Sequence, residues 1–164
     1  MRASLLIFLG SLASCTKPSP QTPSEPARPA PAAESPSATL SLFERLAREG
    51  EKRDQADPST TKVIDALTAA GLSLSNQRQL SAASGGASYC VMFSAAQHVT
   101  LSICEFADPQ SAKVGAESSR VALKEISGRS VDVKRSTMLA VIDSQADEAS
   151  AAIKEKARRA FEAL

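Results

Sequence analysis

The sequence has no tryptophan, one tyrosine and one histidine among its 164 residues. With a single imidazole, at His98, a Ser-His-Asp or Cys-His arrangement would have to use that one residue. No Gly-x-Ser-x-Gly motif accompanies it, and no group of His, Cys and Asp has the spacing of a metal site. We therefore predict no catalytic residues, no cofactor site and no metal site, and we expect a protein that is not an enzyme.

Two other segments resemble parts of functional sites but lack the further residues that such sites require. The Gly-rich stretch Ser84-Gly85-Gly86 has neither the Lys nor the strand-to-helix context of a phosphate-binding loop, so it predicts a turn. The carboxylates of Glu105 and Asp108 flank a predicted helix start, where a capping role explains Asp108. An enzyme with an unfamiliar site would instead need a polar cleft whose titratable groups have shifted pKa values.

The sequence also lacks an excess of either charge. It contains 19 Lys and Arg against 18 Asp and Glu, a net charge of +1. A nearly neutral chain has no electrostatic footprint for a polyanion, so we expect no nucleic-acid partner. The basic residues near the C-terminus alternate with Glu155 and Glu162, which favours a solvated helix face over a basic patch.

No apolar run is long enough to span a bilayer, which takes about 20 residues. The longest candidate is Leu5–Leu12, which follows the positive charge of Arg2 and precedes Ala13-Ser14-Cys15. The order Leu12-Ala13-Ser14-Cys15 resembles the lipobox of bacterial lipoprotein precursors. That resemblance implies a signal peptide over residues 1–14, its removal, and acylation of Cys15, including palmitate.

The same resemblance implies a location in the bacterial cell envelope. Two or more acyl chains anchor a protein stably to a membrane, so Cys15 would tether the chain to the membrane surface. Thr16 stands where Asp would signal retention at the inner membrane, and by analogy this favours the outer membrane, facing the periplasm.

A proline-rich stretch follows the predicted anchor. Seven of the nine prolines fall between Thr16 and Thr39, mixed with Ser, Thr and Ala. Such a composition cannot bury apolar surface, so we predict that residues 15–39 form an extended linker of up to about 70 Å. A proline-rich recognition peptide and a glycosylated stalk are the alternatives. The remaining residues, 40–164, are expected to form one domain.

The clearest pattern in this domain is a β-hairpin formed by residues 88–95 and 99–106. The alternation of side chains sets its register, because one register gathers all the apolar residues on one face. That register also places Cys90 directly opposite Cys104, at the separation that a disulfide requires. We therefore predict a Cys90–Cys104 disulfide, with two buried free thiols or a redox-active pair as alternatives. The predicted apolar face consists of Val91, Phe93, Ala95, Val99, Leu101 and Ile103.

Capping and periodicity place the other elements. Ser41 with Glu44 predicts a helix over residues 41–54, and Asp57-Pro58 predicts the start of another. The two helices could pack as a hairpin, or the first could extend the linker. A polar strand is expected over residues 72–80. Asp108-Pro109 begins a helix that Gly128 ends.

After that helix, residues 131–142 favour a second hairpin over one bent strand, and Ser144 predicts the cap of a last helix. This order of elements predicts an α+β fold, mainly antiparallel, with about four or five strands and the helices packed on one face. The face of the hairpin that carries Cys90 and Cys104 would then be partly open to solvent.

An anchor, a linker and a compact domain indicate a non-catalytic binding or interaction module of the envelope. Its partner would be another envelope protein or a small ligand, in addition to the membrane that holds Cys15. A structural or assembly subunit of an envelope complex is the alternative, and an exposed apolar patch would distinguish it.

Overall fold

The computed structural model describes residues 40–96, 98–145 and 147–164. Cys15, the predicted signal peptide and the predicted linker lie outside these described residues. The elements follow in the order α1 (Leu42–Gly50), α2 (Thr60–Ala69), β1 (Ser75–Leu80), the short 3-10 helix η2 (Ala83–Gly85), β2 (Tyr89–Ala96), β3 (Val99–Glu105), α3 (Pro109–Ala122), β4 (Ser130–Lys134), β5 (Thr137–Asp143) and α4 (Glu148–Glu162).

All five strands form one sheet in the order β1-β2-β3-β5-β4, and each neighbouring pair is antiparallel. The predicted α+β class with a mainly antiparallel sheet is confirmed. The second hairpin is also confirmed, because β4 pairs with β5 across a tight connection at Arg135 and Ser136. Arg135 has the positive φ of 50° that such a turn uses.

The register predicted for the first hairpin is correct along most of its length. Cys90 pairs with Cys104, and the apolar pairs of the core face follow in the expected order. The prediction fails at the end of the hairpin, where Ala96 rather than Ala95 lies opposite Val99. Ala95 is an extra residue on β2, as in a β-bulge, and it still packs against the core.

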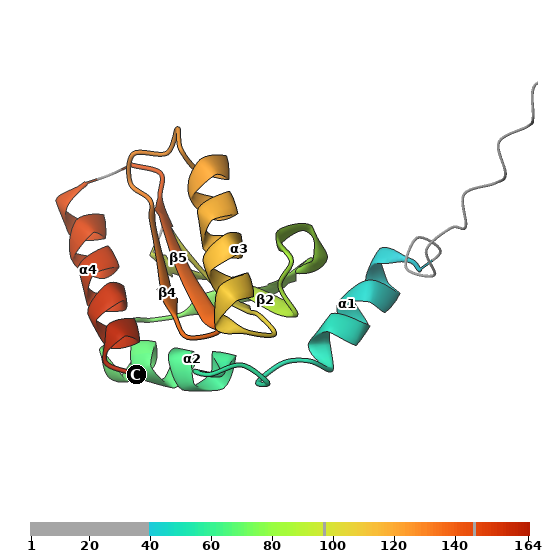
Figure 1. Cartoon of the computed structure of the whole chain (residues 1–164). Coiled ribbons are helices and arrows are strands. Elements are labelled where there is room, and N and C mark those ends of the chain that lie inside the picture. The colour runs from blue at the N-terminus through green and yellow to red at the C-terminus, as the bar shows by residue number, and fades with distance from the viewer. Residues whose placement is uncertain (1–39, 97, 146) are drawn as a thin grey trace, which may run out of the picture. The chain divides into compact units, whose positions relative to one another are not determined.

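The placement of one helix differs from the expectation that all helices cover one face. The α2 and α4 helices cover the face of Val91, Phe93, Leu101 and Ile103, with Phe161 of α4 fully buried there. The α3 helix lies on the opposite face, so that β4 and β5 are sandwiched between α3 and α4 (Figure 1). On the face that carries the two cysteines, α3 therefore covers β4 and β5.

This difference follows from the residues on the cysteine face. Met138, Ala140 and Val131 are apolar side chains of β5 and β4 that point away from α2 and α4. They form a second core with the small residues Ala112 and Ala116 of α3. A helix face of small residues can lie close to a sheet, so α3 packs on this second face. The pattern of the first hairpin alone had indicated that this face is polar.

Two helices begin at other N-cap residues than the sequence predicted. The α2 helix is capped by Ser59 and not by Asp57, and α4 is capped by Asp147 and not by Ser144. In both cases the predicted cap residue forms hydrogen bonds with a residue far away in the sequence. Asp57 exchanges hydrogen bonds with Ser136, and Ser144 donates its backbone N–H to the carbonyl oxygen of His98.

Other local signals acted as expected. Ser41 and Glu44 form a complete capping box at α1, and Asp108 caps α3 through the backbone N–H groups of Gln110 and Ser111. The α3 helix ends at Ala122, earlier than the predicted end at Gly128. Gly128 instead lies against Asp143, where a Cβ atom would come within 2.4 Å of a backbone oxygen.

Candidate functional site

The two cysteines of the hairpin form a disulfide, as the register predicted. Cys90 and Cys104 are joined with a Cα–Cα distance of 4.2 Å, and both are buried. The bond connects β2 to β3 in the middle of the sheet. It belongs to the second core, on the face of the sheet against which α3 packs.

The disulfide lines the floor of a pocket of about 260 Å³ on this face of the sheet. The α3 helix lies over β4 and β5, which leaves part of β2 and β3 uncovered beside it. The floor carries Met138 and Ala140 beside the cysteines, and the α3 wall carries Gly115, Ser119 and Ala122. The opposite wall is the segment of residues 80–87, which contains η2.

Small side chains create this pocket. A Cβ atom on Gly115 would come within 2.4 Å of the ring of Phe106, so the close packing of α3 on Phe106 requires glycine there. The lining residues, all in the described part of the chain, include no charged side chain. Their polar groups are the hydroxyls of Ser81, Ser84, Ser102 and Ser119. Such a surface suits an uncharged apolar group with one or two hydrogen-bonding atoms.

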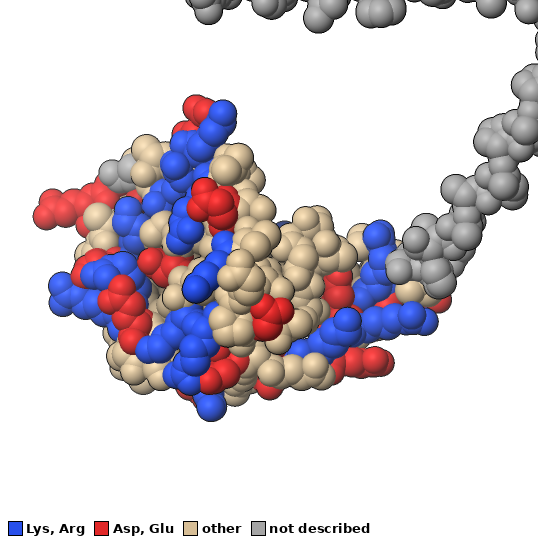
Figure 2. Space-filling model, viewed as in Figure 1, with Lys and Arg blue, Asp and Glu red and all other residues tan. Residues whose placement is uncertain are grey.

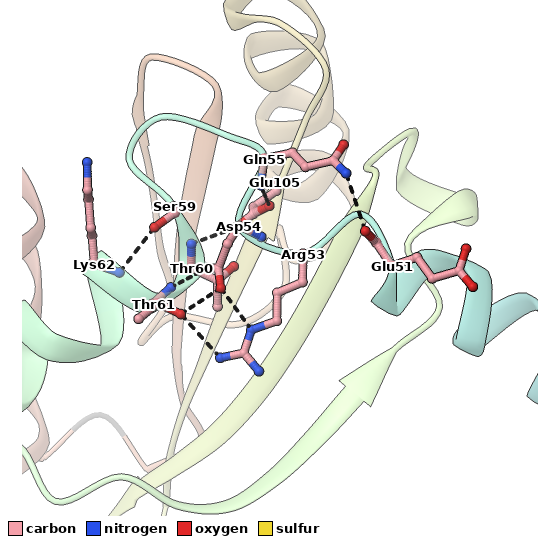
Figure 3. Close-up of polar contacts among 9 residues, drawn as sticks. All are labelled: Glu51, Arg53, Asp54, Gln55, Ser59, Thr60, Thr61, Lys62 and Glu105. Carbon is pink, nitrogen blue, oxygen red and sulfur yellow. Dashed lines mark hydrogen bonds and ion pairs between the residues drawn. The ribbon is translucent and has the colours of Figure 1, made fainter.

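A buried carboxylate, Glu105, lies at the end of β3 (Figure 3). Its side chain is 1% exposed, and its carboxylate accepts hydrogen bonds from the backbone N–H groups of Thr60, Asp54 and Gln55 at 2.5, 3.2 and 3.2 Å. Thr60 is the first residue of α2. The negative charge therefore lies at the positive end of a helix, where it satisfies otherwise unpaired donors.

The neighbours of Glu105 extend this hydrogen-bond network. Asp54 accepts hydrogen bonds from the backbone and the hydroxyl of Thr61 and forms an ion pair with Arg53 (Figure 3). The guanidinium of Arg53 lies 6.0 Å from the ring centroid of Tyr89. Burial raises the pKa of the Tyr89 hydroxyl. Each acidic group is occupied in fixing residues 53–61.

A second group with a perturbed pKa lies on the edge strand β4. Burial raises the pKa of Asp132, although the charge of Arg158 acts in the opposite direction. Its Oδ2 atom is buried and has no hydrogen-bond partner within the described residues. Asp132 lies on the face that α4 covers, whereas the apolar pocket lies on the other face, so the two do not form one site.

The two arginines of α4 are paired with glutamates of the same helix. Arg158 contacts both Glu155 and Glu162, and Arg159 contacts Glu155. These two arginines lower the pKa of Glu155 to about 2. The alternation of charges therefore produces a solvated network along the helix, in agreement with the sequence.

Among residues 40–96, 98–145 and 147–164, no group of three or more His, Cys, Asp or Glu could hold a metal ion. No helix in these ranges has both the length and the hydropathy to cross a membrane. His98 lies just before β3, and its backbone oxygen connects the hairpin to Ser144.

Comparison of the chain with protein-family models, with curated proteins and with solved structures gave no significant match. Sequence reasoning missed both the pocket and the role of Glu105. The row of small residues Ala112, Gly115, Ala116 and Ser119 was a usable signal for the pocket, because it forces a close approach of α3. Nothing in the sequence linked Glu105 to Thr60.

Proposed function

We propose that this protein is a lipid-anchored, non-catalytic binding module of the bacterial envelope. Cys15 holds it to the outer membrane on the periplasmic side, and residues 16–39 separate the domain from the bilayer. The domain binds an uncharged apolar ligand, or an apolar side chain of another envelope protein, in the pocket beside α3.

The observation that carries the binding role is the chemistry of the pocket. Its floor is a rigid sheet cross-linked by the Cys90–Cys104 disulfide, and its lining combines apolar groups with serine hydroxyls. A preformed apolar concavity with a few polar atoms is typical of small-molecule sites. The groups with raised pKa values, Tyr89 and Asp132, are not among the lining residues. This arrangement favours binding over chemistry.

The anchor is tested by intact mass spectrometry of the protein extracted from membranes. We expect a species that begins at Cys15, carries the mass of the acyl chains and gains the mass of two hydrogen atoms on reduction under denaturing conditions. An unacylated species would remove the membrane part of the proposal and leave the pocket unaffected.

The pocket is tested with a filled variant and a matched control. Ser119→Phe places a ring in the pocket, whereas Ser118→Phe adds the same ring at the neighbouring position, which does not line it. Benzene is a suitable probe, because apolar cavities bind it. We expect NMR shift changes near Cys90 and Ala140 on titration of the wild type and of Ser118→Phe, and none for Ser119→Phe. Equal responses of all three proteins would contradict the proposed site.

One observation favours the assembly subunit as a second candidate. Val114 and Val121 are large apolar residues one above the other on the outer side of α3, and they are 58% and 60% exposed. If they form a protein contact, the full chain should self-associate or capture a partner, and Val121→Lys should abolish this. Sedimentation velocity of both proteins decides the question.

A further inference from the structure

The first described helix presents its apolar side chains to solvent. None of the nine residues of α1 is buried, and Phe43 and Leu42 are 83% and 49% exposed. These are two of the four large apolar side chains in the described residues that are exposed in this way. The helix is nevertheless well formed, because Ser41 and Glu44 cap it reciprocally.

The other end of α1 is attached to the domain through polar contacts. Gln79 of β1 donates its side-chain amide to the carbonyl oxygen of Leu46 at 2.6 Å. The carboxylate of Glu49 accepts the backbone N–H groups of Ala82 and Ala83 at 3.0 and 3.2 Å. These contacts hold the C-terminal half of α1 on the domain, so the exposed pair lies at its free, N-terminal end.

The charges that remain available on α1 are positive. Its two acidic residues are used internally, Glu44 in the capping box and Glu49 against η2. Arg45 and Arg48 form no ion pair with any of the described residues. Figure 2 shows basic side chains over α1. An apolar side bordered by arginines is the pattern of a helix that lies in a membrane interface.

We propose that the N-terminal end of α1 docks on the bilayer surface, with Phe43 and Leu42 inserted among the lipid chains and Arg45 and Arg48 against anionic headgroups. The position of α1 in the chain supports this occupant. It begins 27 residues after Cys15, at the end of the proline-rich stretch. A tether of that length keeps α1 within about 85 Å of the membrane, at a high effective concentration. The inference rests on the proposed anchor for this proximity.

The absence of tryptophan from the sequence permits a direct test. Phe43→Trp introduces a single reporter at an exposed position, where it leaves the packing of the domain intact. The full-length variant is reconstituted in vesicles of phosphatidylethanolamine and phosphatidylglycerol that contain lipids brominated high in the acyl chains. Because interfacial helices bury their apolar face about 5–10 Å deep, we expect the bromines to quench about half of the tryptophan emission of this variant.

Val121→Trp is the matched control, since Val121 is exposed on α3, outside the proposed contact. We expect weak quenching of the control variant under the same conditions. Replacing the anionic lipid by phosphatidylcholine should reduce the quenching of the Phe43→Trp variant, as should Arg45→Gln with Arg48→Gln. Vesicle flotation, measured in parallel, reports the anchor separately, so a failed anchor is distinguished from a failed helix contact.

Three results would overturn the inference. Equal quenching at positions 43 and 121 would show that the contact is not specific to α1. Quenching at neither position, on vesicles that carry the protein, would show that α1 does not enter the bilayer. A blue shift in the emission of the Phe43→Trp variant that grows with protein concentration and is insensitive to bromine would show that a second copy of the chain covers this position instead.

Discussion

Glu105 and Thr60 lie 45 residues apart in the sequence, yet the carboxylate of Glu105 accepts the first backbone N–H of α2 at 2.5 Å. This hydrogen bond connects the centre of the sheet to the helix that covers it. It also fixes the approach of residues 54 and 55, whose N–H groups bind the same carboxylate. The Glu105 side chain thus stabilises the start of α2 together with the Ser59 cap.

Replacement of this carboxylate should be costly. Glu105→Gln removes the charge and turns an NH₂ group towards backbone donors, so we expect the free energy of unfolding to fall by about 2 kcal/mol. Urea denaturation of the variant and the wild type measures the difference. Glu125→Gln is the control, because Glu125 is an exposed residue after α3 and should change stability by less than about 0.5 kcal/mol. Equal stability of the Glu105 variant would show that water satisfies these donors.

The disulfide should contribute to stability through the unfolded chain. The cysteines are separated by 14 positions, and closing a loop of this size is worth about 3 kcal/mol in the entropic description. The double variant Cys90→Ala with Cys104→Ala should lose about this amount in urea denaturation. Reductant should destabilise the wild type similarly and leave the variant unchanged. A variant as stable as the oxidised protein would contradict this prediction.

The glycine beneath Phe106 should be intolerant of any side chain. Gly115→Ala places a methyl group within 2.4 Å of the Phe106 ring, and overpacking of this kind costs about 1–3 kcal/mol. A thermal or urea denaturation series measures the loss. Gly85→Ala is the matched control, because a Cβ atom there meets nothing within 4 Å. A similar effect of both substitutions would show that backbone entropy, and not the contact with Phe106, decides the outcome.

Two aspartates should shift the pH dependence of stability in opposite directions. Burial raises the pKa of Asp132 in the folded state above its ordinary value of 3.8. Between these two pKa values the folded state binds more protons than the unfolded state, so the protein loses stability as the pH rises through this range. The stability of Asp132→Asn relative to the wild type should therefore increase as the pH is raised from acidic to neutral.

Hydrogen bonds from Ser150 lower the pKa of Asp147 in the folded state. Its contribution to stability is therefore present at neutral pH and is lost as the pH falls through the folded-state pKa.

Asp147→Asn should accordingly be less stable than the wild type at neutral pH, and the difference should vanish in acid. Urea denaturation of the three proteins across this pH range provides the comparison. The same sign of change for both variants would contradict the assignment of the two shifts to burial and to hydrogen bonding.

The sequence determined the features that depend on neighbours along the chain. Side chains alternate strictly along a strand, so the apolar residues of β2 and β3 allowed one register, and that register paired Cys90 with Cys104. Capping residues act within one turn, so Ser41 and Asp108 marked the starts of α1 and α3. The order of helices and strands, the second hairpin and the antiparallel α+β class follow from such local patterns.

The tertiary structure decided what depends on residues far apart. Hydrogen bonding of Asp57 with Ser136 moved the cap of α2 to Ser59, and Glu105 reached Thr60 across the sheet. The small side chains of α3 allow it to pack on the face of the sheet that carries the cysteines, although the pattern of the first hairpin alone did not predict a helix there. The pocket exists only because α3, η2 and the sheet meet there. Contacts of this kind depend on the relative positions of packed elements, and periodicity and composition do not encode those positions.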